Sequence, residues 1–65
     1  MVDVFDQNAP RVNNKIKVIG RFETDKEGLE FIKALNPDKT ITTESPPYGD
    51  GKLVFVNGDY SYFVG

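Results

Sequence analysis

Residues 24–35 form the only segment with a clear helical pattern, and this segment determines what the rest of the chain must provide. Thr24 and Glu27 have the spacing of a capping box, in which the two side chains satisfy free N–H groups at the start of a helix. Pro37 ends the segment, because a residue that precedes a proline is disfavoured in the helical conformation. An isolated helix of about a dozen residues is marginal in water. The rest of the chain must therefore offer an apolar surface on which this helix can pack.

The helical segment has one apolar and one polar side. At 3.6 residues per turn, the apolar side carries Gly28, Leu29, Phe31, Ile32 and Leu35, and the polar side carries Lys26, Glu27, Glu30 and Lys33. We expect the apolar side to lie across one face of a sheet.

Residues 15–23 have the alternation of a strand with one buried and one wet face. The expected buried face carries Ile16, Val18, Gly20 and Phe22, and the wet face carries Lys15, Lys17, Ile19, Arg21 and Glu23. Gly20 marks either a bulge or a close approach of the helix. Residues 39–44 are rich in β-branched residues but contain a single apolar one, which favours a polar edge strand.

A β-hairpin is predicted near the C-terminus. Residues 52–56 and 59–64 flank Asn57 and Gly58, the dipeptide best suited to a type I′ turn. Regular alternation would place Leu53, Phe55, Tyr60, Tyr62 and Val64 on one face, and Val54, Val56, Ser61 and Phe63 on the other. Since both faces are apolar, this hairpin lies inside the sheet or one of its faces meets a partner.

These elements predict an α+β fold with a small single-layer, mostly antiparallel sheet of about four strands and one helix packed on one face. The element order is β-α-β-β-β, and the pattern leaves the strand order open. Residues 1–14 are expected to form an N-terminal tail or a short edge strand built on Val2, Val4 and Phe5. Residues 15–65 are expected to form a single α+β domain.

The composition excludes several kinds of site. The chain has no cysteine and no histidine, which rules out thiolate and imidazole metal sites and Ser-His or Cys-His nucleophiles. We predict no catalytic, cofactor-binding or metal-binding residue, and no enzyme activity. The longest apolar run, residues 53–56, is too short to cross a bilayer. The first residues include acidic side chains, whereas a signal peptide begins with basic ones. We therefore expect a cytoplasmic protein that does not act at a membrane.

Two surfaces are candidates for binding. The hairpin has more apolar side chains than one helix covers, so either the N-terminal segment with Val2, Val4 and Phe5 covers the second face or the surplus meets another molecule. An exposed apolar patch usually marks an interface. The candidate partner-binding residues are Tyr48, Tyr60, Tyr62 and Phe63. The net charge is −2, yet four cations occur in residues 11–21 without any acid. These cations, Arg11, Lys15, Lys17 and Arg21, are expected to form a basic stripe beside the wet face of the first strand.

The function predicted from these features is a small non-enzymatic module that regulates or inhibits a partner protein through an exposed sheet face. The partner is another protein, or a second copy in a homodimer. A miniature α+β chain without catalytic groups is typical of the accessory proteins of bacteria and their phages. The alternative is a module that binds single-stranded nucleic acid with the basic stripe and aromatic rings.

Overall fold

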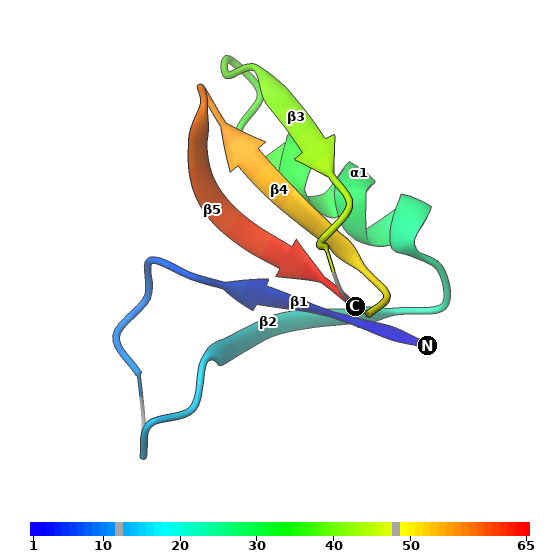
Figure 1. Cartoon of the computed structure of the whole chain (residues 1–65). Coiled ribbons are helices and arrows are strands. Elements are labelled where there is room, and N and C mark those ends of the chain that lie inside the picture. The colour runs from blue at the N-terminus through cyan, green and yellow to red at the C-terminus, as the bar shows by residue number, and fades with distance from the viewer. Residues whose placement is uncertain (12, 48) are drawn as a thin grey trace.

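The computed structural model describes residues 1–11, 13–47 and 49–65, which form an antiparallel sheet with a helix on one side (Figure 1). The elements are β1 (Val2–Asp6), β2 (Lys17–Phe22), α1 (Asp25–Leu35), β3 (Ile41–Glu44), β4 (Lys52–Val56) and β5 (Asp59–Val64). The strand order is β2-β1-β5-β4-β3, and each neighbouring pair is antiparallel. The α+β class is confirmed. The expected count of about four strands is corrected to five, because the N-terminal segment is part of the sheet.

Strand β1 is an interior strand, which corrects the expectation of a tail or an edge strand. It pairs with β2 on one side and with β5 on the other. Val4 lies opposite Val64 and is fully buried, and Asp3 and Gly65 exchange two backbone hydrogen bonds of 2.9 and 3.3 Å. The pairing with β5 joins opposite ends of the chain, so no local pattern in the first residues indicates it.

The start and the end of α1 are stabilised by side chains. The Glu27 N–H donates to Thr24 Oγ1 at 3.3 Å, and the Thr24 hydroxyl lies 3.3 Å from Glu27 Oε1. At the other end, Asn36 Nδ2 donates to the Ile32 carbonyl at 2.9 Å. The expected polar side of α1 is exposed, whereas Leu35, expected on the apolar side, is 51% exposed.

Helix α1 approaches the sheet closely at Gly28. A Cβ atom at this position would lie 3.1 Å from both Val4 Cγ2 and Val64 Cγ1, which is tighter than an ordinary contact. The fully buried core consists of Val4, Ile32, Val54 and Val64, and the Phe22 and Phe31 rings pack beside it with centroids 5.2 Å apart. The absence of a side chain at Gly28 therefore lets the helix rest directly on β1 and β5.

Two β-bulges change which side chains share a face. In β2, Gly20 pairs with Val4 but Val18 pairs with Phe5, so Ile19 is an extra residue. In β5, Tyr62 pairs with Val54 but Tyr60 pairs with Phe55, so Ser61 is an extra residue. Each bulge reverses the alternation on one side of it.

The bulges correct the predicted faces of both segments. Tyr62 and Val64 join Val54 and Val56 on the side of α1, whereas Phe63 joins Leu53, Phe55 and Tyr60 on the opposite side. In β2, Val18 leaves the face of Phe22 and is 46% exposed, and Ile19 packs against the core instead.

The predicted hairpin and edge strand are confirmed. Asn57 and Gly58 have φ values of 52° and 87°, as a type I′ turn requires. The Asn57 side chain also binds the residue that precedes β3, because its Oδ1 accepts a 3.0 Å hydrogen bond from the Thr40 N–H. β3 is an edge strand beside β4, with Ile41 packed against the core.

Candidate functional site

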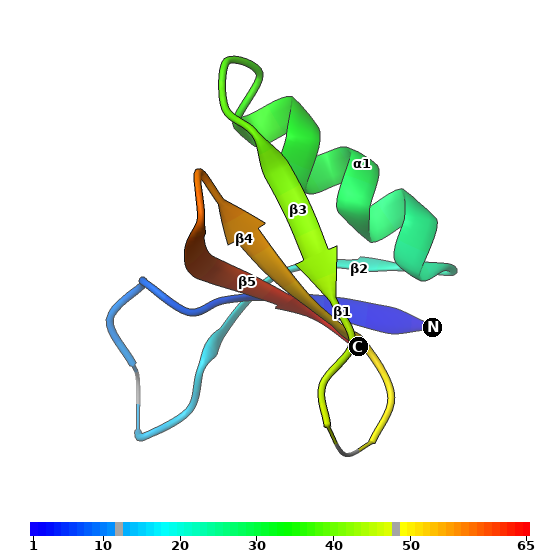
Figure 2. The ribbon, with the colours of Figure 1, turned by 45° about the horizontal axis from the view of Figure 1, so that its top comes forward.

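The candidate site is the face of the sheet opposite α1, which we call the open face. Phe5 pairs with Val18 and Phe63, and Phe63 pairs with Leu53, so these side chains share this face. Phe55 and Tyr60 form a further pair on it. Figure 2 shows α1 on one side of the sheet, and none of the described helices and strands on the other. The apolar part of the open face therefore consists of Phe5, Val18, Leu53, Phe55, Tyr60 and Phe63, and the same register places Asp3, Arg21 and Thr42 on this side of the sheet.

The aromatic rings of the open face pack in pairs. The centroids of Phe5 and Phe63 are 6.0 Å apart with planes at 41°, and those of Phe55 and Tyr60 are 5.7 Å apart at 45°. Both are tilted arrangements that aromatic pairs favour. Tyr60 is 40% exposed, and the partial burial of its ring raises the pKa of its hydroxyl. The face is thus an ordered apolar surface that still leaves apolar atoms in water.

Gly51 brings the β3–β4 connection against this surface. Its φ is +103°, and a Cβ atom there would lie 2.6 Å from Phe63 Cζ and 2.7 Å from the Val64 carbonyl oxygen. Only glycine fits both the backbone conformation and the space. The connection therefore packs against Phe63 and borders the open face at one end.

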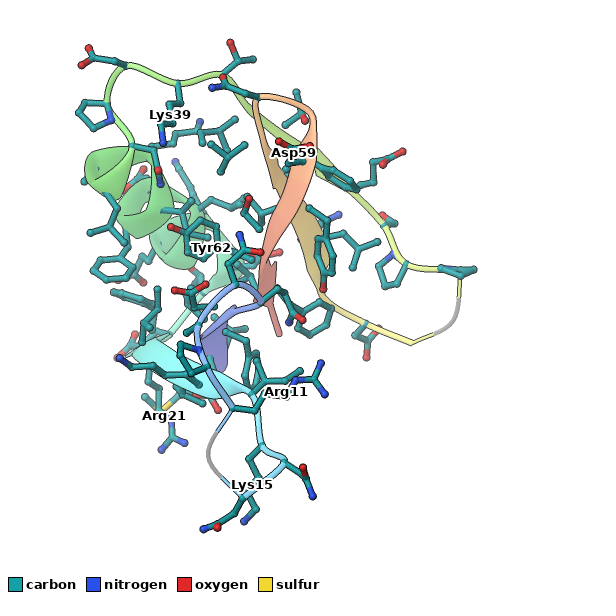
Figure 3. The ribbon with its side chains drawn as sticks, turned by 90° about the vertical axis from the view of Figure 1, so that its left-hand side faces the viewer. Arg11, Lys15, Arg21, Lys39, Asp59 and Tyr62 are labelled. Atoms are coloured by element: carbon teal, nitrogen blue, oxygen red, sulfur yellow. The ribbon has the colours of Figure 1, made fainter. Side chains whose placement is uncertain are left out.

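Charged residues of opposite sign flank the open face at diagonally opposite corners. The basic corner, Arg11 and Lys15, lies on the β1–β2 connection, and Figure 3 shows Arg11 directed away from α1. The acidic corner consists of Glu44, which pairs with Leu53, and Asp50 in the β3–β4 connection. Since β1 and β4 run in the same direction, the two connections lie at opposite ends of the sheet as well as near opposite edges.

An ion pair between Arg21 and Asp3 joins β2 to β1. Arg21 Nε lies 2.7 Å from Asp3 Oδ1, and the side chains are 64% and 25% exposed. The hydrogen bond from Arg21 holds the pKa of Asp3 below its usual value, and the same bond raises the pKa of Arg21. The charge of Arg21 is therefore balanced within the molecule.

The predicted aromatic residues are divided between the two sides of the sheet. Tyr60 and Phe63 lie on the open face, whereas Tyr62 lies between the sheet and α1 (Figure 3), where Asn36 Nδ2 donates to its hydroxyl at 3.4 Å. Tyr48 is outside the described residues. Phe5, Val18, Leu53 and Phe55 were not among the predicted binding residues, although the alternation of the hairpin placed Leu53 and Phe55 on one face with Tyr60.

The structure does not bring the four predicted cations together. Arg11 and Lys15 lie on the β1–β2 connection, and Arg21 points in a different direction from Arg11 (Figure 3). Lys17 pairs with Asp6, which in turn pairs with Tyr62, so Lys17 projects from the α1 side. The bulge at Ile19 lies between Lys17 and Arg21 and sends them to opposite sides.

Within residues 1–11, 13–47 and 49–65 there is neither a pocket nor a group of His, Cys, Asp and Glu side chains arranged to hold a metal ion. No helix in this part of the chain is long and apolar enough to cross a membrane.

Comparisons of the chain with protein-family models, with curated proteins and with solved structures found no match.

Proposed function

We propose that this chain is a small non-enzymatic protein-binding module that regulates or inhibits a partner protein through the open face. The observation that supports this function best is the apolar sheet face itself, with Tyr60 and Val18 at 40% and 46% exposure. Contiguous exposed apolar surface on a small domain usually marks a binding site. Aromatic residues are also enriched at the centre of protein interfaces.

The border of the open face fits the same proposal. Protein interfaces combine an apolar centre with a polar rim, and charges on the rim select the partner and its orientation. Here the centre is formed by the Phe5–Phe63 and Phe55–Tyr60 pairs, and the rim by the basic and acidic corners. A partner would therefore cover the rings and present opposite charges to the two corners.

Single-stranded nucleic acid is the alternative ligand for this face. Its rings and the cations of the basic corner form the combination that such ligands bind. However, Glu44 and Asp50 border the same face and would repel phosphates, Arg21 is balanced by Asp3, and the net charge is −2. These charges favour a protein partner.

The test is affinity capture with the tagged chain and two matched variants. Val18→Thr/Tyr60→Thr removes apolar atoms from the open face and places a β-branched residue, which strands favour, at both positions. Leu35→Gln, the control, removes an exposed apolar side chain from the end of α1. We expect wild type and the control to retain one protein through nuclease and high salt, and the open-face variant to lose it. Circular dichroism spectra must show that both variants are folded.

Two results would overturn the proposal. Retention of the same protein by the open-face variant would place its binding site elsewhere. Loss of the captured material after nuclease treatment, or a steep loss with rising salt, would indicate nucleic acid. Arg11 and Lys15 would then be the residues to replace.

A further inference from the structure

We propose that the open face binds a second copy of this chain, so that two molecules form a symmetric dimer through their sheets. This inference rests on the proposed function, because it assumes that the open face binds protein, and it names one partner for that face. A second copy offers what the face requires, namely an apolar centre and both charges at the correct corners.

The dimensions of the molecule are compatible with such a dimer. The molecule measures 32 × 23 × 22 Å, and its broadest side, which is the upper limit for the area that the open face can bury, is on the order of the 800 Å² per partner of a standard interface. Two sheets that pack face to face stand about 10 Å apart, with side chains interlocked between them. The tilted ring pairs and Leu53 would form the centre of this layer.

The charges specify the arrangement of the two copies. A twofold axis can lie in the plane between the sheets, perpendicular to the diagonal that joins the basic and acidic corners. This axis places Arg11 and Lys15 of each copy over Glu44 and Asp50 of the other. One symmetry operation thus creates two attractive contacts, as expected for an interface formed by the same patch on both subunits. The positive charge of Lys52 lies away from the acidic corner. Lys52 pairs with Val64 on the α1 side, and its Nζ lies 3.4 Å from Ser45 Oγ.

The edges of the sheet are less suited to self-association than the face. The bulge at Ile19 interrupts the edge strand β2, and Lys17 and Arg21 flank it. The other edge strand, β3, has four residues, and Thr42, Thr43 and Glu44 are exposed. Bulges, charges and short length are features that discourage pairing of edge strands. The face is therefore the surface on which a second copy would bind.

The dimer has a consequence for regulation. Because both copies use the open face, another protein can bind this face only after the dimer dissociates. Binding of such a partner would then weaken as the chain is concentrated. Salt would weaken the dimer, because it screens the exposed charges of the two corners.

A charge-exchange experiment tests the arrangement. Variant A carries Arg11→Glu and Lys15→Glu, and variant B carries Glu44→Lys and Asp50→Lys. Each variant alone would bring like charges together at both corners, and we expect its self-association to be more than about tenfold weaker than that of wild type. In a mixture of A and B both corners are attractive again, so the heterodimer should form. The control, Glu30→Lys/Lys33→Glu, exchanges charges on the exposed side of α1 and should dimerise like wild type.

The measurement is sedimentation equilibrium over a range of concentrations, in which the chain of 7.3 kDa should approach twice that mass. A wild type that dimerises while the mixture of A and B stays monomeric would overturn the proposed arrangement. A wild type that stays monomeric at all concentrations would overturn the dimer. In that case the proposed function still stands if Val18→Thr/Tyr60→Thr loses the captured protein, and fails with the dimer if it does not.

Discussion

At the scale of single residues, Gly28 is the position where a local preference and the packing of the molecule oppose each other. Glycine inside a helix is less favourable than alanine by about 1 kcal/mol. In this chain the glycine allows α1 to lie on Val4 and Val64, both of which are fully buried. Neither valine can move aside without disturbing two paired strands of the sheet. The close contact therefore outweighs the loss in helix propensity.

Gly28→Ala is expected to lower the free energy of unfolding by about 1 kcal/mol. Overpacking a filled core costs about 1–3 kcal/mol, which exceeds the gain in helix propensity of about 1 kcal/mol. Urea denaturation followed by circular dichroism measures the difference. Ala34→Gly, at an exposed position of the same helix, serves as the control and isolates the propensity effect. A more stable Gly28→Ala variant would show that the helix can lift off the sheet at little cost.

At the scale of elements, the two bulges decide the character of both faces of the sheet. An uninterrupted β5 would place Tyr62 beside Tyr60 and leave Phe63 under α1. The extra residue Ser61 exchanges these positions. The Ser61 side chain is largely buried, and its hydroxyl donates a hydrogen bond to the Asp59 carbonyl at 3.0 Å. The buried hydroxyl inside the bulge therefore has a hydrogen-bond partner.

This exchange predicts that the two tyrosines have different roles. Tyr62→Ala should lower the free energy of unfolding by about 2–3 kcal/mol, because it removes a large side chain from beside the core. Tyr60→Ala should lower it by about 1 kcal/mol or less, since this side chain contributes mainly a cross-strand pair with Phe55. Yet Tyr60→Ala should weaken capture of the partner protein. Thermal unfolding and affinity capture of both variants provide the comparison, and equal stability losses would contradict the assignment of the faces.

At the scale of the whole molecule, the N-terminal segment closes the fold. β1 separates β2 from β5, so the sheet would divide into two parts without it. Val4 is also one of the four fully buried core residues. The first six residues are thus as much a part of the core as the C-terminal hairpin.

A chain that begins at residue 15 is therefore expected to be unfolded. It lacks β1, which pairs with both β2 and β5 and contributes Val4 to the buried core. Proton–nitrogen correlation spectra should show poor dispersion for this chain, and an added peptide of residues 1–10 should restore dispersed signals. A well-dispersed spectrum of the truncated chain alone would show that residues 15–65 form a domain without β1.

Local patterns predicted the elements that depend on neighbours in the sequence. The capping threonine, the two-sided helix, the type I′ turn at Asn57 and the polar edge strand all result from interactions within a few residues. The strand order, the role of β1 and the bulges at Ile19 and Ser61 depend on residues far apart in the chain. For the candidate site, the alternation of the hairpin placed Leu53, Phe55 and Tyr60 on one face, but it could not show that Phe63, Phe5 and Val18 join them.

The sequence by itself determined that this protein is a small α+β chain with one amphipathic helix, a C-terminal hairpin and no histidine or cysteine chemistry. Only the tertiary structure decided which side chains remain uncovered. The physical reason is the period of a strand: because side chains alternate, one extra residue moves every following side chain to the other face. Whether that extra residue is accommodated depends on the neighbouring strand and on the helix above it. The open face is therefore a property of the assembled sheet and not of any one segment.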